Sequence, residues 1–352
     1  MKQLRNTLIR TGFDAISISG LHHVLRPVLG GVGIIFMLHH VRPARGGPFQ
    51  PNRHLEVTPD FLRETLLHLR RLDIEVVTLD EAHRRLAQRD FARRFACFTA
   101  DDGYRDNRDH ALPVMCEFGA PLMVYVAADF AQGAGRIWWV ALERTIAAAT
   151  RIDARIGGVH LLLDAATPQQ KQIAFARIHD LLRKLPTDHD VQHEVHDLAR
   201  MHGIDDEAIS RELCLSWDEL RDFARDPLVS IGAHTVSHCN LAHESAQMMT
   251  QQMQISRARI EAMLECKVRH FAYPYGDRDA AAAREFAAAR ALGFDTAVTT
   301  RPGVLFAEHA EHLTALPRIS LNGNYQSTRF LSVLTSGTAT AVWNGFRRVD
   351  AA

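Results

Sequence analysis

Apolar and polar residues alternate along this chain as short apolar runs separated by longer amphipathic stretches. From residue 33 onward, continuous apolar runs of strand length are each followed by a segment with helical spacing. The predicted strands are 33–40, 74–79, 94–100, 121–128, 228–234, 269–276, 294–300 and 313–321. Continuous apolar strands alternating with helices are typical of a parallel sheet covered by helices. Seven or eight such strands favour an α/β fold of the closed or nearly closed type, a distorted (β/α)7-8 barrel.

Polar cap residues mark where several helices begin. Thr58 followed by Pro59 predicts a helix start, because a hydroxyl can accept from an early backbone N–H and proline suits the first turn. Ser216 and Glu219 have the spacing of a capping box. Asp80 is predicted to cap a short helix over 81–88. Further helices are expected over 244–265 and 279–292.

Residues 130–215 interrupt the alternation. Three helical stretches occur here without a clear strand among them, so we expect a helical insertion between two barrel units. The chain is therefore divided into an N-terminal helical segment (1–32), a barrel that includes the insertion (33–325) and a C-terminal helical tail (326–352).

The bulk composition excludes some classes of function. Of 352 residues, 41 are Lys or Arg and 41 are Asp or Glu, so the composition does not favour nucleic acid as a partner. The five cysteines include no CxxC pair, which fits a reducing compartment better than a disulfide framework. The first residues form an amphipathic pattern without the features of a signal peptide. We expect a soluble, cytoplasmic protein whose first helix packs on the domain, with peripheral membrane contact as the alternative.

Polar residues gather directly after the predicted strands. The clusters are His39-His40, Asp101-Asp102, His234 with His238, and Tyr273-Pro274-Tyr275. The carboxyl ends of the strands in a parallel barrel converge on one face, where active sites are built. Residues far apart in the sequence can therefore meet there around one ion.

His234 and His238 are four residues apart, so both imidazoles share one side of a helix or a tight turn. A carboxylate from Asp101 or Asp102 would complete a set of two histidines and one aspartate, leaving positions open for water and substrate. The remaining aspartate could then act as the general base.

Each of these patterns also has an ordinary structural interpretation. Alone, two histidines at this spacing are more often helix surface, and Asp-Asp-Gly is more often a turn. Their joint placement at strand ends favours metal chemistry. The pair His39-His40 is equally compatible with lining a site and with structural hydrogen bonds. The pair Trp138-Trp139 fits the core of the insertion better than a stacking platform for sugar rings.

Several motifs in order resemble those of the polysaccharide deacetylases, the carbohydrate esterase family 4 proteins with a NodB-homology domain. The segments "FTADDG" (98–103), "HTVSHCNL" (234–241) and "FAYPYG" (271–276) carry the resemblance, which extends from about Gly33 to Leu321. It implies a distorted barrel of fewer than eight regular strands and one divalent metal. Zinc is the first choice, with cobalt, manganese, nickel or iron as alternatives. The implied reaction removes N-acetyl or O-acetyl groups from a sugar or polysaccharide, as in exopolysaccharide or cell-envelope metabolism.

The same resemblance implies roles for individual residues. Asp101 aligns with the general base, and Asp102, His234 and His238 align with the metal ligands. The backbone N–H of Tyr275 aligns with the donor to the oxyanion. Tyr104, Tyr273 and Pro274 are expected to contact the substrate.

The sequence also departs from the family pattern. Ala100 replaces a phenylalanine, Ala272 stands where many members carry an arginine that orients the catalytic aspartate, and the segment "FDTAVTT" (294–300) lacks a tryptophan. Arg318 stands where well-studied members carry a histidine that acts as general acid. Our hypothesis is that Arg318 reaches Asp101 in place of the missing arginine, and that His39 or His40 supplies the acid.

Two other functions remain open from the sequence. Two histidines and one carboxylate are also the ligand set of non-haem iron oxygenases, although those enzymes usually have an all-β scaffold. A barrel that binds glycans without cleaving them would explain the missing arginine and histidine. The presence of a base and three ligands favours the hydrolase.

Overall fold

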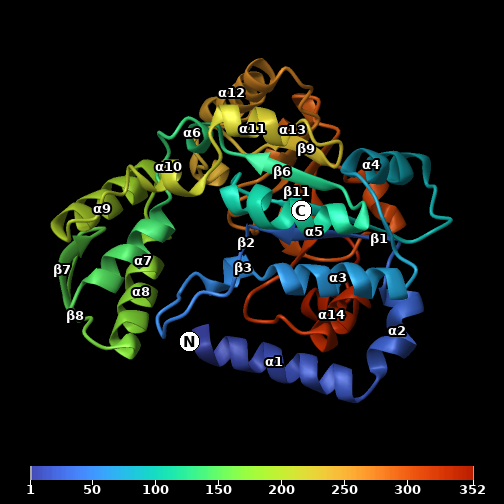
Figure 1. Cartoon of the computed structure of the whole chain (residues 1–352), viewed down its shortest axis with the longest axis horizontal. Coiled ribbons are helices and arrows are strands. Elements are labelled where there is room, and N and C mark those ends of the chain that lie inside the picture. The colour runs from blue at the N-terminus through green and yellow to red at the C-terminus, as the bar shows by residue number, and fades with distance from the viewer. Residues whose placement is uncertain (1, 352) are drawn as a thin grey trace.

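The computed structural model describes residues 2–351, and its centre is a sheet of parallel strands that closes on itself (Figure 1). Within those residues the ring has seven members, in the spatial order β1-β12-β11-β10-β9-β6-β5, and β5 pairs back with β1. The strands are β1 (Gly33–Leu38), β5 (Phe95–Ala100), β6 (Leu122–Val126), β9 (Val229–Ala233), β10 (His270–Ala272), β11 (Thr296–Pro302) and β12 (Leu316–Ser320). The predicted distorted barrel is confirmed.

Apolar side chains on both faces hold these strands in place. Every residue of β1 and β5 is buried, and the rings of Phe36 and Phe98 stack with centroids 5.1 Å apart. Burial on both faces explains why these segments are continuous apolar runs without polar alternation. The predicted strand at 74–79 exists but is shorter than expected, because only β4 (Glu75–Val76) pairs with β5 before the next helix begins.

Helices cover the outside of the ring. They are α3 (Pro59–Arg71), α4 (Leu79–Gln88), α5 (Leu112–Phe118), α11 (Trp217–Phe223), α12 (Ala246–Leu264) and α13 (Ala283–Ala291). The caps of α3 and α11 are confirmed, with Ser216 and Glu219 forming the capping box. The predicted cap at Asp80 is wrong. Thr78 caps α4 by accepting from the N–H of Glu81, which leaves Asp80 inside the first turn.

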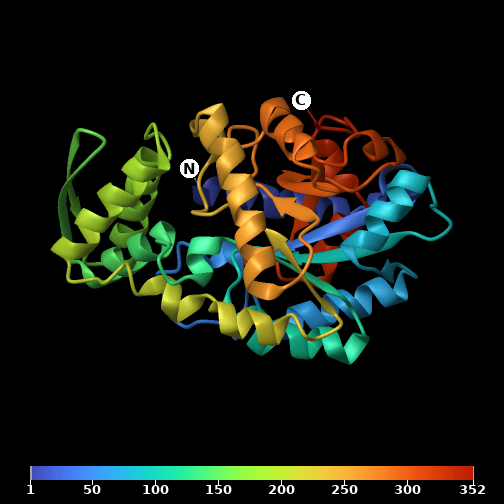
Figure 2. The same cartoon turned by 90° about the horizontal axis from the view of Figure 1, so that it is seen from above.

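An arm formed by residues between β6 and β9 stands at one side of the barrel (Figures 1 and 2). It contains α6 (Ala128–Ala131), α7 (Trp138–Ala148), β7 (Arg151–Ile156), β8 (Val159–Asp164), α8 (Pro168–Leu182), α9 (Asp188–Met201) and α10 (Ile209–Leu213). The prediction that this insertion is purely helical is wrong, because β7 and β8 form an antiparallel hairpin. Exposed and buried residues alternate along β7, a period of two that marks a strand with one buried face.

Helices from both ends of the chain lie together beside the barrel. They are α1 (Lys2–Ile18), α2 (Leu21–Leu29), α14 (Thr328–Thr335) and α15 (Thr338–Trp343), in contact with one another. The ring of Phe13 on α1 lies 5.4 Å from those of Tyr325 and Phe330. Over residues 2–351, none of the helices combines the length and apolar content needed to cross a bilayer.

Candidate active site

The two adjacent aspartates lie directly beyond β5, at its carboxyl end. Asp101 and Asp102 are only 2% and 1% exposed, and the N–H of Asp101 still donates to the carbonyl of Leu38 on β1. The chain then turns, because Asp102 and Gly103 both adopt left-handed backbone angles. The last regular pairing of β5 therefore fixes Asp101, and the turn directs Asp102 elsewhere.

Asp102 faces two histidines that follow β9, which is separated from β5 by β6 in the sheet. Its Oδ1 lies 3.4 Å from Nε2 of His234 and 3.3 Å from Nε2 of His238. One ligand atom from each residue lies within 4.8 Å of the others, and all three side chains are buried. Such a set of two imidazoles and one carboxylate is the ligand set of catalytic zinc sites, which keep further positions open.

The chemistry of these atoms fits a bound cation. Nδ1 of His234 lies 2.7 Å from the carbonyl of Ala272, which can only accept, so Nδ1 carries the proton. In the neutral ring, Nε2 then directs a lone pair at Asp102, whose buried Oδ1 receives no hydrogen bond from the described residues. Burial opposes charging of His234, yet the carboxylates of Asp102 and Asp101 raise its pKa above the usual value. A divalent metal would supply the positive charge that this cluster attracts.

The two histidines are carried by a tight turn rather than by a helix. Thr235 and His238 have φ of 64° and 58°, in the left-handed region that ordinary residues avoid. The side-chain oxygen of Gln252 on α12 accepts from two backbone N–H groups of this turn, those of Val236 and Ser237. The sequence spacing thus indicated the shared direction of the imidazoles but not the backbone that produces it.

Arg318 on β12 holds Asp101 in a two-point ion pair. Nη1 and Nη2 of the guanidinium each lie 2.7 Å from one oxygen of the carboxylate, and both side chains are buried. Burial would raise the pKa of Asp101, but the guanidinium more than offsets it and the pKa is lowered. The hypothesis that Arg318 reaches Asp101 therefore agrees with the geometry, and the carboxylate is ionised at neutral pH.

The neighbouring histidines His39 and His40 point to different places. The ring of His39 lines the pocket with the aspartates, and its Nε2 lies 4.0 Å from Asp101. Burial lowers its pKa, although both aspartates oppose that effect. His40 instead bonds Asp106 at 2.6 Å and stacks on Tyr104 at 3.6 Å. The structure therefore corrects the assignment of His40 as a candidate acid. Its Nδ1 is bonded to Asp106, and the side chain does not line the pocket.

The segment 273–275 contributes one residue to the pocket. Tyr275 has φ of 61°, and its ring packs edge-on against His238 with centroids 5.2 Å apart. Three predicted substrate contacts need correction, because Tyr104 and Tyr273 are fully buried and Pro274 is buried too, outside the pocket lining. Tyr273 donates instead to the carbonyl of Thr314, and Tyr104 supports His40.

A cavity of about 420 Å³ opens above these groups. Besides the predicted residues it is lined by side chains that the motifs did not indicate. From the barrel they are Met37, Asn52, His54, Leu55, Asp277, Thr300 and Ser320, and from the arm Trp138, Trp139, His179 and Arg183. The two tryptophans belong to the buried core of the arm, as predicted, and also form a wall of the cavity. Only their adjacency, unusual for tryptophan, could have drawn attention to them.

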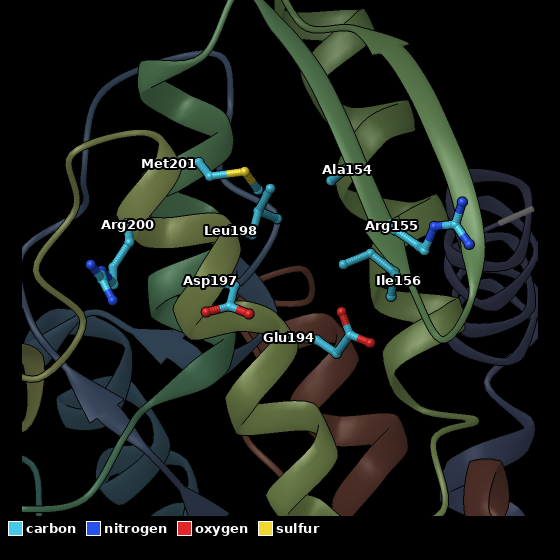
Figure 3. A pocket seen from close by; sticks show the side chains of 8 residues that line it. All are labelled: Ala154, Arg155, Ile156, Glu194, Asp197, Leu198, Arg200 and Met201. Atoms are coloured by element: carbon cyan, nitrogen blue, oxygen red, sulfur yellow. The ribbon is translucent and has the colours of Figure 1, made fainter.

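A second cavity, of about 490 Å³, lies wholly within the arm between β7 and α9 (Figure 3). Its polar lining mixes Glu194 and Asp197 with Arg155 and Arg200. Figure 3 shows these charged groups pointing in different directions rather than toward one point. The cavity therefore lacks the convergent polar groups that characterise a binding site.

A closed ring of parallel strands with its polar groups at the carboxyl ends places the protein among the (β/α)7 barrels. The family model "Polysaccharide deacetylase" matches residues 88–297, more than half of the chain, and the chain belongs to this family. Among curated proteins, none matches this sequence.

Solved structures agree in fold. The deacetylase PplD of Streptococcus pyogenes, solved in complex with acetate, is similar over 83% of this chain and 92% of its own, with 17% identity and a TM-score of 0.54. The putative polysaccharide deacetylase BA0330 of Bacillus anthracis is similar over 86% of this chain and 68% of its own, with 15% identity and a TM-score of 0.52. At these identities the likeness supports the barrel alone.

Proposed function

We propose that this protein is a metal-dependent deacetylase that hydrolyses an N-acetyl or O-acetyl group on a sugar or polysaccharide. Exopolysaccharide or cell-envelope glycan metabolism is the setting that the resemblance suggests. The observation that carries the proposal is the buried cluster of Asp102, His234 and His238 beside an aspartate, Asp101, held by Arg318. Membership in the polysaccharide deacetylase family supports the substrate class.

In this proposal Asp102, His234 and His238 hold the metal, which when bound polarises the acetyl carbonyl and activates a water molecule. Asp101 takes the proton of the attacking water, because it is ionised and lies beside the ligand set. The backbone N–H of Tyr275 donates to the developing oxyanion. His39, the histidine of the 39–40 pair that lines the cavity, passes to the leaving group the proton that Asp101 has taken, since its Nε2 lies 4.0 Å from that carboxylate.

The proposed metal is zinc, with cobalt, manganese, nickel or iron as alternatives. Two imidazoles and one carboxylate with open positions match the ligands of catalytic zinc. The same set is compatible with an iron oxygenase. However, that chemistry would leave the Asp101–Arg318 pair without a role. Iron in the purified protein together with oxoacid-dependent activity would favour the oxygenase.

A cytoplasmic location is a further part of the proposal, and peripheral membrane contact of the N-terminal helix is the alternative to its packing on the domain. Free cysteines at all five positions fit a reducing compartment. The packing of α1 against α14 agrees with the preferred interpretation, and the exposed apolar side chains Leu8, Val24 and Val28 are what the membrane alternative would use.

The test is release of acetate from a panel of N- and O-acetylated sugars by the zinc-loaded protein. Wild type should release acetate, and Asp101→Asn should lose activity on the order of 10³-fold with zinc content retained. The control is Asp106→Asn, which alters a partner of His40 outside the cavity. If neither wild type nor Asp101→Asn releases acetate from any sugar, the glycan-binding barrel is the correct interpretation.

A further inference from the structure

Asp188 is a buried carboxylate from the arm that the proposed chemistry does not use. It begins α9 and is 7% exposed, close to the pocket rather than in the interior of the arm. One oxygen accepts from the backbone N–H of Asn240, and the other accepts from the hydroxyl of Tyr275 at 3.3 Å. Both donors are neutral and both belong to the barrel, so Asp188 joins the arm to two separate barrel segments.

The first of these segments is the turn that carries the metal-binding histidines. Asn240 follows His238 by two residues, and the turn contains the left-handed residues Thr235 and His238. Left-handed backbone is unfavourable for residues other than glycine, so surrounding contacts must hold it. Gln252 fixes the N–H groups of Val236 and Ser237, and Asp188 fixes the far end of the same turn.

The second segment is the turn at Tyr275. Its phenol donates to Asp188 and accepts from Nε1 of Trp138 at 2.9 Å, while the guanidinium of Arg183 lies 4.4 Å from the ring centre. All three of these partners come from the arm. The ring in turn packs against His238, so a shift of the arm would reach both the imidazole and the backbone N–H of Tyr275.

Attaching one element to another through a buried carboxylate with two neutral hydrogen-bond donors costs desolvation free energy. Burial removes the carboxylate charge from water, and no full ion pair among the described residues offsets this cost. The positive end of the α9 dipole offsets only part of it. Apolar packing would attach the arm at less cost. A directional acceptor for two donors at fixed positions has a different advantage, because it sets the distance between the two turns.

We propose that Asp188 is a positioning residue that locks the turn of His234 and His238 to the turn of Tyr275, so that the arm completes the geometry of the metal site. The inference rests on the proposed function, because the geometry concerned is that of the proposed metal ligands. Residues that orient metal ligands from the second layer typically change metal affinity or activity 10- to 100-fold when they are replaced.

The experiment measures zinc affinity by competition with a chromophoric chelator, together with kcat and KM for acetate release. Asp188→Ala should weaken zinc binding 10- to 100-fold and lower kcat more than it changes KM. Asp188→Asn keeps the shape and one acceptor, so its loss should be smaller. Tyr275→Phe removes only one of the two links, so it should weaken zinc binding less than Asp188→Ala does.

The matched control is Asp206→Asn, a second buried aspartate of the same insertion. Asp206 is 2% exposed and pairs with His196 at 2.8 Å, away from the cavity. The substitution Asp206→Asn should lower the melting temperature without weakening zinc binding. Equal weakening by Asp206→Asn and Asp188→Asn would overturn the inference in favour of general destabilisation of the arm.

If the wild type binds zinc and releases acetate, and Asp188→Ala binds zinc with the same affinity, the inference about Asp188 is overturned while the proposed function stands. If Asp188→Ala does not fold, the isosteric Asp188→Asn decides the same question. A wild-type protein that binds no zinc would instead overturn the proposed function and the inference together.

Discussion

The barrel and the arm contribute different things to the same cavity. The barrel supplies the groups proposed to react, since Asp101, Asp102, His234, His238 and Arg318 all lie on strands or just beyond them. The arm supplies Trp138, His179 and Arg183 as a wall, and Asp188 as a link behind it. Rigid strands fix reacting groups within narrow limits, whereas an inserted unit can change shape without disturbing them. The comparison predicts that substitutions in the barrel abolish turnover and that those in the arm adjust it.

The largest expected effect comes from removing the proposed metal ligands of the barrel. Treatment with a chelator, or His234→Ala, should reduce acetate release to background, and added zinc should restore activity only in the wild type. Because a ligand that binds only the folded state stabilises it, by about 4 kcal/mol at a thousandfold excess over Kd, the melting temperature should fall as well. Metal analysis and calorimetry measure both.

The control for this experiment is His243→Ala, an exposed histidine close by in the sequence. It should keep both metal and activity. Equal loss of zinc from His243→Ala would show that the metal binds elsewhere.

The next effect separates the two adjacent histidines of the barrel. His39→Gln should lower kcat about 100-fold, because a positioned proton donor typically contributes 10²–10⁴-fold. His40→Gln should lower the melting temperature through loss of its contact with Asp106 and leave kcat nearly unchanged. Steady-state kinetics of the two variants make the comparison. Equal loss in both would contradict the assignment of the acid to His39.

Arg318→Ala tests whether Arg318 controls the ionisation of Asp101, through the pH dependence of kcat/KM. Without the guanidinium, burial is no longer offset and the pKa of Asp101 should rise, so the acidic limb of kcat/KM should move to higher pH. The lowered pKa also means that the ion pair stabilises the fold above the usual carboxyl pKa and loses that contribution as pH falls. Breaking a buried pair from one side should cost about 3–5 kcal/mol of unfolding free energy. An unchanged pH profile would show that Arg318 is structural only.

The smallest effect on activity is expected in the wall of the arm. Arg183→Ala should raise KM about tenfold, equivalent to about 1.4 kcal/mol, with little change in kcat. The control is Arg177→Ala, an exposed arginine of α8, the helix that ends at Arg183. A fall in kcat with KM unchanged would move Arg183 from the substrate wall to the positioning group around Tyr275.

The sequence predicted those parts of the molecule that follow from local rules. Apolar runs located the barrel strands, and the order of polar clusters after them indicated which residues would meet, because parallel strands share one end. Even the contact between Arg318 and Asp101 was predicted, because Ala272 replaces the arginine that orients the catalytic aspartate in many family members. By contrast, the sequence did not distinguish His39 from His40. Successive side chains of a strand point to opposite faces, and the pattern alone does not say which of the two histidines faces the pocket.

The arm was predicted least well, for two physical reasons. Its hairpin is short and contains Gly157-Gly158 at the turn, and exposed and buried residues alternate only along the six positions of β7, whereas β8 has a single buried residue. Its role in the cavity depends on long-range contacts, such as Asp188 with Asn240, that leave no mark in either local sequence. Tyr104, Tyr273 and Pro274 failed for a related reason, since an aromatic residue beside a motif can support the site from behind as readily as contact a ligand.

The left-handed backbone at Asp102, Thr235, His238 and Tyr275 has a consequence for how the chain folds. These conformations are stable only when surrounding contacts hold them, and Asp188 on α9, far away in the sequence, holds both the turn of His238 and the turn of Tyr275. These two turns should therefore form late, after the ring and the arm have assembled. In that case zinc cannot act as a nucleus for folding, as it does in small zinc-dependent domains. Refolding rates measured with zinc and with a chelator should be equal, and only the unfolding rate should slow in zinc.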